Sequence, residues 1–201
     1  MTSLKPPLAQ VEWGFGLRWV IATTVGWVVG FTLCEALKAF LAAIAYWVGH
    51  IGTPDGAVIG ISVGIAQGIA LRQYISGARW WILASIIGFA IGKVVGDALA
   101  RAVPGVVGSG LSGAAIGVSV GIVQWFVLRR HIVHAGWWVL ASGLAWAVGW
   151  SIISIVEETA SGSTVTAYIF GVLGAAIAGV ITAAVLMRLF RSNRGRREAL
   201  G

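Results

Sequence analysis

Apolar residues fill this chain in six runs, which short segments rich in polar residues, glycine and proline separate. Each run is close to the roughly 20 residues that a helix needs to cross a bilayer core about 30 Å thick. The pattern therefore predicts an all-α integral membrane protein with six transmembrane helices. The expected spans are residues 15–37, 56–74, 80–102, 107–129, 137–157 and 165–189.

Two sequence blocks recur along the chain. W-W-I-L-A-S begins at Trp80 and returns as W-W-V-L-A-S at Trp137, 57 residues later, and a weaker copy begins at Arg18. The second block, G-x-S-x-G-x-x-Q-x-x-x-L-R, begins at Gly60 and again at Gly117, also 57 residues apart. Because a fixed period is the signature of a repeat architecture, the helices are expected to form two-helix repeats.

The third copy of the second block keeps its small residues but lacks the glutamine, and Thr182 lies nearby. Three repeats then make up one transmembrane domain, residues 15–190. A cytoplasmic segment precedes it and a basic cytoplasmic tail follows it. The predicted parts are residues 1–14, the repeats at about 15–74, 78–130 and 136–190, and the tail at 191–201.

Composition excludes a water-soluble globular protein. Of 201 residues, 58% are hydrophobic and 10% charged, against roughly 45–50% and about 25% in soluble domains. The single cysteine, Cys34, excludes an intrachain disulfide, and three histidines without clustered carboxylates do not predict a metal site. We expect no metal, no other cofactor and no catalytic residues.

Basic residues favour one orientation in the membrane. Eleven lysines and arginines fall at one set of helix ends, and only Lys38, Lys93 and Arg101 fall at the other. The positive-inside rule then places both termini in the cytoplasm, in the cell (inner) membrane. The tryptophan pairs lie at the same inner ends, where they fit an interfacial aromatic belt.

The 29 glycines lie mostly inside the apolar runs, often four residues apart. Residues at this spacing share a helix face, so each series forms a flat surface on which a neighbouring helix can pack closely. The alternative is that one such face points outward and binds a partner helix or a flat ligand. The expected packing glycines are Gly60, Gly64, Gly88, Gly92, Gly117 and Gly121.

Two glutamines, Gln67 and Gln124, lie near the glycine faces. An amide in hydrocarbon needs a partner, so each is expected to form a hydrogen bond between helices or to line a polar pathway. The repeated G-x-S-x-G resembles a hydrolase nucleophile elbow, but that motif needs a turn between a strand and a helix. Here it lies within a helix, where the serine can donate to the carbonyl one turn back.

Three charged residues are candidates for a role inside the membrane. Measured along the helix from Trp81, Lys93 lies about 18 Å and Asp97 about 24 Å into the bilayer, spaced to form a pair. Glu35 occupies the position in the first repeat that Asp97 occupies in the second. These residues either form a polar pathway with the two glutamines or lie just under the outer headgroups.

Arg72, Arg129 and Arg130 at the inner helix ends are expected to contact lipid headgroups. A role in nucleic-acid binding is not supported, because the basic residues are dispersed among helix ends.

The repeated blocks resemble repeats of bacterial multi-pass membrane proteins with no assigned activity, a resemblance that covers most of residues 18–150. The first hypothesis is a non-enzymatic membrane protein with a structural or accessory role, able to form a homo-oligomer or to bind a partner membrane protein. The second is a small cation or proton transporter or channel. A weaker one, suggested by 11 tryptophans, is lipid or pigment binding.

Overall fold

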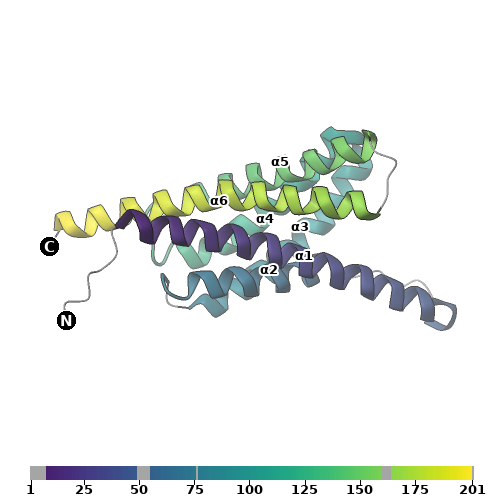
Figure 1. Ribbon diagram of the computed structural model, residues 1–201, viewed down its shortest axis with the longest axis horizontal. Coiled ribbons are helices and arrows are strands. Elements are labelled where there is room, and N and C mark those ends of the chain that lie inside the picture. The colour runs from purple at the N-terminus through teal and green to yellow at the C-terminus, as the bar shows by residue number, and fades with distance from the viewer. Residues whose placement is uncertain (1–7, 49–54, 76, 160–163, 201) are drawn as a thin grey trace.

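The computed structural model describes residues 8–48, 55–75, 77–159 and 164–200 (Figure 1). These residues form six α-helices and no strand. Residues 1–7 of the predicted N-terminal segment lie outside this part, as does Gly201 of the predicted tail. The helices are α1 (Leu8–Val48), α2 (Asp55–Leu71), α3 (Ala78–Ala102), α4 (Gly105–Leu128), α5 (Trp137–Thr159) and α6 (Thr164–Leu200).

In the described part of the chain, five helices are long and apolar enough to cross a membrane, so the chain is a multi-pass, membrane-embedded helical protein. The sixth, α2, is apolar but has only 17 residues, at the lower end of the roughly 17–25 that a crossing needs. The apolar stretches are Trp13–Ala42, Arg79–Ala102, Gly105–Leu128, Trp137–Val156 and Tyr168–Asn193.

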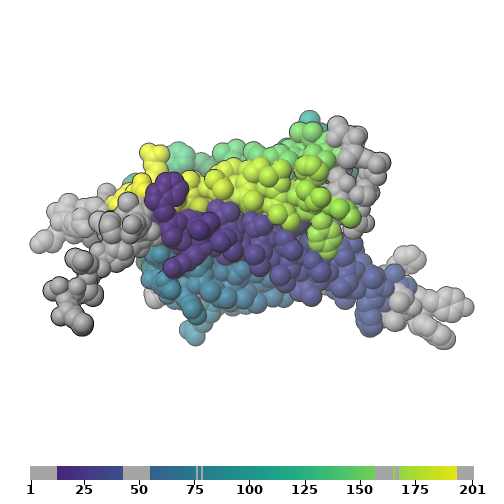
Figure 2. All heavy atoms as spheres, in the orientation of Figure 1, coloured from purple at the N-terminus to yellow at the C-terminus, as the bar shows by residue number. Residues whose placement is uncertain are grey.

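The helices form a closed ring. Each packs against the next in the chain, and α6 returns to pack against α1, while no other pair of the described helices brings its backbones close together. Figure 2 shows α1 and α6 side by side along one face of the molecule. The start of α1 and the end of α6 lie at the same end of the ring (Figure 1).

The turns at residues 72–75 and 129–136 lie at that same end because successive helices alternate in direction. This end carries Arg72, Arg129, Arg130 and Arg188 and is called the basic end here. The opposite end, called the distal end, carries Glu35, Lys38, Asp55, Lys93 and Asp97.

Two helices are longer than the sequence pattern predicts. Helix α1 continues to Val48, beyond the expected end at residue 37, and α6 continues to Leu200 through the segment that was predicted as a tail. The segment added to α1 is rich in alanine and the segment added to α6 is rich in arginine; both residues favour helix, and neither segment contains proline. Hydropathy marks where a chain leaves the bilayer, whereas helix propensity decides where the helix ends.

Glycines lie where helix backbones approach most closely. A Cβ atom on Gly88 would be 2.5 Å from Cα of Val120, and one on Gly92 would be 2.6 Å from Cα of Ile116. At Gly117 a Cβ atom would collide with a backbone carbonyl oxygen. The other contacts of this kind pair Gly60 with Ile86, Gly64 with Ser85, and Gly121 with Val139.

Candidate functional site

Three tryptophans from alternate helices meet on the axis of the ring. Trp19 on α1, Trp81 on α3 and Trp138 on α5 have at most 2% of their surface exposed. Their ring centroids are 5.8 Å apart for Trp19 and Trp81, 5.9 Å for Trp19 and Trp138, and 5.6 Å for Trp81 and Trp138. Tilted and edge-on contacts at this distance are favourable for aromatic rings. These axial tryptophans fill the centre of the ring.

Each axial tryptophan donates its indole N–H to a polar side chain of another helix. A buried indole N–H needs an acceptor, and here the acceptors come from the three helices between those that carry the tryptophans. The three hydrogen bonds, each 3.0 Å long, are Trp81 to Oε1 of Gln67, Trp138 to Oε1 of Gln124, and Trp19 to Oγ1 of Thr182.

The glutamine amides bond to a third helix as well. Nε2 of Gln67 donates to Oγ1 of Thr23 at 3.0 Å, so Gln67 on α2 joins α1 to α3. Nε2 of Gln124 donates to Oγ of Ser85 at 2.9 Å, so Gln124 on α4 joins α3 to α5. The predicted hydrogen bonds between helices are therefore present. They occupy the amide nitrogen and oxygen of both glutamines.

Thr182 on α6 has a simpler arrangement than the two glutamines. Thr182 accepts the hydrogen bond from Trp19 and donates its hydroxyl hydrogen to the carbonyl of Ala178, 2.6 Å away in its own helix. A hydroxyl has one hydrogen to donate, so Thr182 has none left for α5. Six side chains make up this polar layer: Thr23, Gln67, Ser85, Gln124, Ser142 and Thr182.

A cavity of about 10 Å³ lies against the polar layer, lined by five of these side chains and by Trp138. That volume is close to the minimum of roughly 10–15 Å³ that one water molecule requires. On the side away from the axial tryptophans the cavity meets Phe89 and Trp146, whose rings are 5.2 Å apart. The polar layer thus has aromatic rings on both sides along the axis.

The predicted polar pathway falls into two separate sets of residues. Gln67 and Gln124 lie on the axis, whereas Glu35, Lys93 and Asp97 lie at the distal end, where they are partly exposed. Among the described residues, no hydrogen bond or ion pair that the structure defines joins the two sets.

The distal charges form local ion pairs. Nζ of Lys93 lies 2.6 Å from Oδ1 of Asp97, as the spacing predicts. Nζ of Lys38 lies 2.9 Å from Oε1 of Glu35 and 3.0 Å from Oδ2 of Asp55. The Asp97 and Glu35 side chains are each 40% exposed, which is compatible with access to water or headgroups. In the described part of the chain, no group of three histidine, cysteine or carboxylate side chains could hold a metal.

The predicted aromatic belt was wrong for one tryptophan of each pair. Trp80 and Trp137 are 52% and 63% exposed, as an interfacial residue would be, but Trp81 and Trp138 are buried on the axis. Adjacent residues on a helix point about 100° apart, and here the second tryptophan of each pair points to the axis while the first points outward. The serine of each W-W-x-L-A-S block could have identified which tryptophan is buried, because this polar residue lies one turn beyond the buried tryptophan on the same helix face.

The serine of the first G-x-S-x-G block behaves as a helix residue. Oγ of Ser62 donates to the carbonyl of Val58, one turn back, at 3.2 Å.

At the basic end, Arg72, Arg129 and Arg130 are exposed, and the Arg129 guanidinium lies 4.6 Å from the ring centroid of Phe126. This cation–π contact gives the Arg129 guanidinium a favourable partner within the protein.

No protein-family model, curated protein or solved structure matches this chain. The fold itself defines the class: a multi-pass helical membrane protein.

Proposed function

We propose that this protein is a non-enzymatic integral membrane protein with a structural or accessory role, whose six helices form a rigid ring with a closed axis. The observation that carries this proposal is the set of axial tryptophans, which pack against one another and donate all three indole N–H groups to neighbouring helices. A ring whose centre is filled and hydrogen-bonded resists deformation.

Three two-helix repeats with six crossings are part of the proposal. Equivalent positions carry equivalent contacts, since a tryptophan of each odd-numbered helix meets a polar acceptor of an even-numbered one. The equivalent pairs are Trp81 with Gln67, Trp138 with Gln124, and Trp19 with Thr182.

Glycine packing holds the ring together in this proposal. The expected packing glycines are buried, and a side chain on any of them would meet a neighbouring helix. Buried glycines leave no flat glycine face for a partner, so a homo-oligomer or a partner membrane protein would need another surface. We expect membrane lipids as partners and neither a cofactor nor nucleic acid.

The orientation in the membrane is proposed from charge. The basic end holds the start of α1 and the end of α6, and the arginines of the two intervening turns are exposed there. The positive-inside rule then favours cytoplasmic termini and a location in the cell (inner) membrane.

A cation or proton transporter is the second proposal, and the small polar cavity on the axis is the observation that favours it. Transport through the ring would require the axial tryptophans to separate. The distal carboxylates would then serve as the entrance, although each described one is already paired with a lysine.

Flux into proteoliposomes distinguishes the two proposals. With a pH-sensitive dye or a cation-sensitive dye inside, we expect proton and potassium influx equal to that of protein-free liposomes. Asp97→Asn and Glu35→Gln should leave the rate unchanged. Influx above the protein-free rate that falls in Asp97→Asn would replace the scaffold proposal with the transporter.

A further inference from the structure

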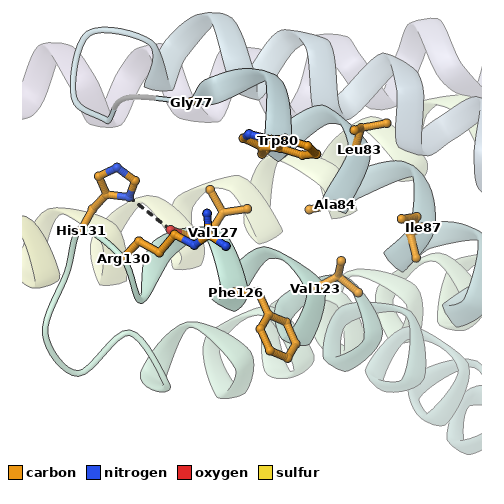
Figure 3. A pocket seen from close by; sticks show the side chains of 10 residues that line it. All are labelled: Gly77, Trp80, Leu83, Ala84, Ile87, Val123, Phe126, Val127, Arg130 and His131. Carbon is orange, nitrogen blue, oxygen red and sulfur yellow. Dashed lines mark hydrogen bonds between the residues drawn. The ribbon is translucent and has the colours of Figure 1, made fainter.

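A groove opens between α3 and α4 at the basic end of the ring (Figure 3). Its volume is about 570 Å³, within the roughly 300–1,000 Å³ of small-molecule sites. Its walls are apolar, and Arg130 and His131 lie at one end while Ile87 lies at the other. The lining residues are Gly77, Trp80, Leu83, Ala84, Ile87, Val123, Phe126, Val127, Arg130 and His131.

A second groove of about 670 Å³ lies between α5 and α6. It is the counterpart of the first in the next repeat: Trp137, Leu140, Ala141 and Leu144 follow Trp80, Leu83, Ala84 and Ile87 by 57 residues. Arg188 takes the place of Arg130, and His134 and Ser192 lie nearby. The remaining lining residues are Ile181, Val185 and Leu189.

Each groove runs from the interface into the hydrocarbon. The seven residues from Trp80 to Ile87 span about 10 Å along the helix, and half of a bilayer core is about 15 Å thick. The exposed indoles of Trp80 and Trp137 lie beside the cationic ends, at the level where interfacial tryptophans occur. The grooves therefore have the direction and depth of a lipid acyl chain.

The arginines of the grooves are available to an anion. Arg130 and Arg188 are exposed, and neither has an ion pair or hydrogen bond with another described residue. The acidic side chains that the structure describes are Glu35, Asp55 and Asp97, all at the distal end.

His131 is fixed close to Arg130. Its Nδ1 lies 3.1 Å from the carbonyl oxygen of Val127, a geometry in which Nδ1–H donates (Figure 3). Nδ2 of Asn193 donates to the backbone oxygen of His131 at 3.0 Å, which ties the turn at residues 129–136 to α6. That turn supplies polar groups to both grooves.

The first helix pair differs at the matching positions. Arg18 replaces the tryptophan and Gln73 replaces Arg130, and Nη1 of Arg18 donates to Oε1 of Gln73 at 3.4 Å. The cation at this site thus has a partner within the protein. Among the described residues, the second and third pairs each combine an apolar groove with an arginine that lacks such a partner.

We propose that each of these two grooves binds one molecule of an anionic phospholipid, with an acyl chain along the apolar walls and the phosphate at Arg130 or Arg188. A guanidinium suits phosphate because it offers several donors in a fixed plane. The site is independent of the proposed function, since a scaffold and a transporter would both present it.

Native mass spectrometry of the full chain in detergent tests this proposal, with phosphatidylglycerol and phosphatidylcholine of the same acyl chains as probes. We expect two phosphatidylglycerol molecules to be retained per chain, with phosphatidylcholine bound at least fivefold more weakly. The double variant Arg130→Gln/Arg188→Gln copies Gln73 of the first pair. It should weaken phosphatidylglycerol binding about fivefold at each groove, the effect of one arginine near a membrane surface.

A matched control removes the same charge from the same end. Arg18→Gln/Arg72→Gln changes arginines of the first helix pair that line neither groove, and it should change binding by less than twofold. A second pair of variants tests the acyl-chain part: Ile87→Trp/Leu144→Trp fills the grooves at exposed positions and should reduce retention of both lipids. Val94→Trp/Val165→Trp, at exposed positions outside the grooves, should not.

Three results would overturn the proposal. They are equal retention of the two lipids by the natural chain, equal losses in the two arginine double variants, and unchanged retention after the grooves are filled.

Discussion

Polar groups on the axis of the ring and polar groups at its distal end are held in different ways. On the axis, Gln67 and Gln124 are neutral, almost fully buried, and bonded to side chains of two other helices. At the distal end, Lys93 and Asp97 are charged, partly exposed, and paired one turn apart on one helix.

The difference follows from the cost of desolvation. A neutral amide in a low-dielectric interior loses little when every donor and acceptor finds a partner, whereas an ion pair must also recover the solvation of two charges. Links between helices are therefore made with amides, hydroxyls and indoles where water is excluded. The charged side chains lie at the two ends of the ring, where headgroups and water remain accessible.

The largest effect should come from removing an axial amide. Gln124→Leu leaves the buried N–H of Trp138 without its acceptor and removes the hydrogen bond that Oγ of Ser85 accepts, which should lower the free energy of unfolding by about 3 kcal/mol or more. Unfolding in sodium dodecyl sulfate, followed by tryptophan fluorescence, measures it. Gln73→Leu makes the same change at an exposed site and should cost less than about 1 kcal/mol. Equal losses of unfolding free energy in Gln124→Leu and Gln73→Leu would contradict the view that the axial hydrogen bonds stabilise the fold more than exposed ones do.

The next largest effect concerns helix spacing near the axis. Gly88→Ala places a methyl group 2.5 Å from Cα of Val120, and a backbone cannot move aside as a side chain can. We expect a loss of about 2 kcal/mol in the same unfolding assay.

Gly110→Ala is the matched substitution nearer the distal end. Its methyl group meets only Oγ of Ser151, at 2.7 Å, which a rotation of the serine relieves. Alanine also favours helix over glycine by about 1 kcal/mol, so this variant should be neutral or more stable. A smaller loss in Gly88→Ala than in Gly110→Ala would reverse the comparison.

The smallest effect should come from a distal ion pair. Asp97→Asn removes the partner of Lys93, but both side chains are partly exposed, so the loss should stay below about 1 kcal/mol. It should shrink further in concentrated salt, which screens exposed charges. A loss as large as that of Gln124→Leu would show that the distal pair is as important to folding as the axis.

Much of the fold could be predicted because the bilayer restricts what a chain can do. Backbone groups in hydrocarbon must bond internally, so an apolar run of sufficient length implies a helix. The pairing of Lys93 with Asp97 and the hydrogen bonds of the two glutamines between helices were likewise predictable from spacing and desolvation.

The extra length of α6 was not predictable from hydropathy, because this helix extends past its apolar run into an arginine-rich segment. The role of the tryptophans was also missed, although the serine one turn beyond Trp81 and the one beyond Trp138 lie on the same inward face. The charged and amide candidates looked like one pathway in sequence, but the ring places them at different depths.

By itself, the sequence determined that the chain is a helical membrane protein, because its composition and the length of its apolar runs admit no other structure. Only the tertiary structure decided which face of each helix points inward. That choice depends on contacts between residues such as Trp19 and Thr182, 163 positions apart. Closing the ring brings α1 against α6, and no local pattern contains that contact.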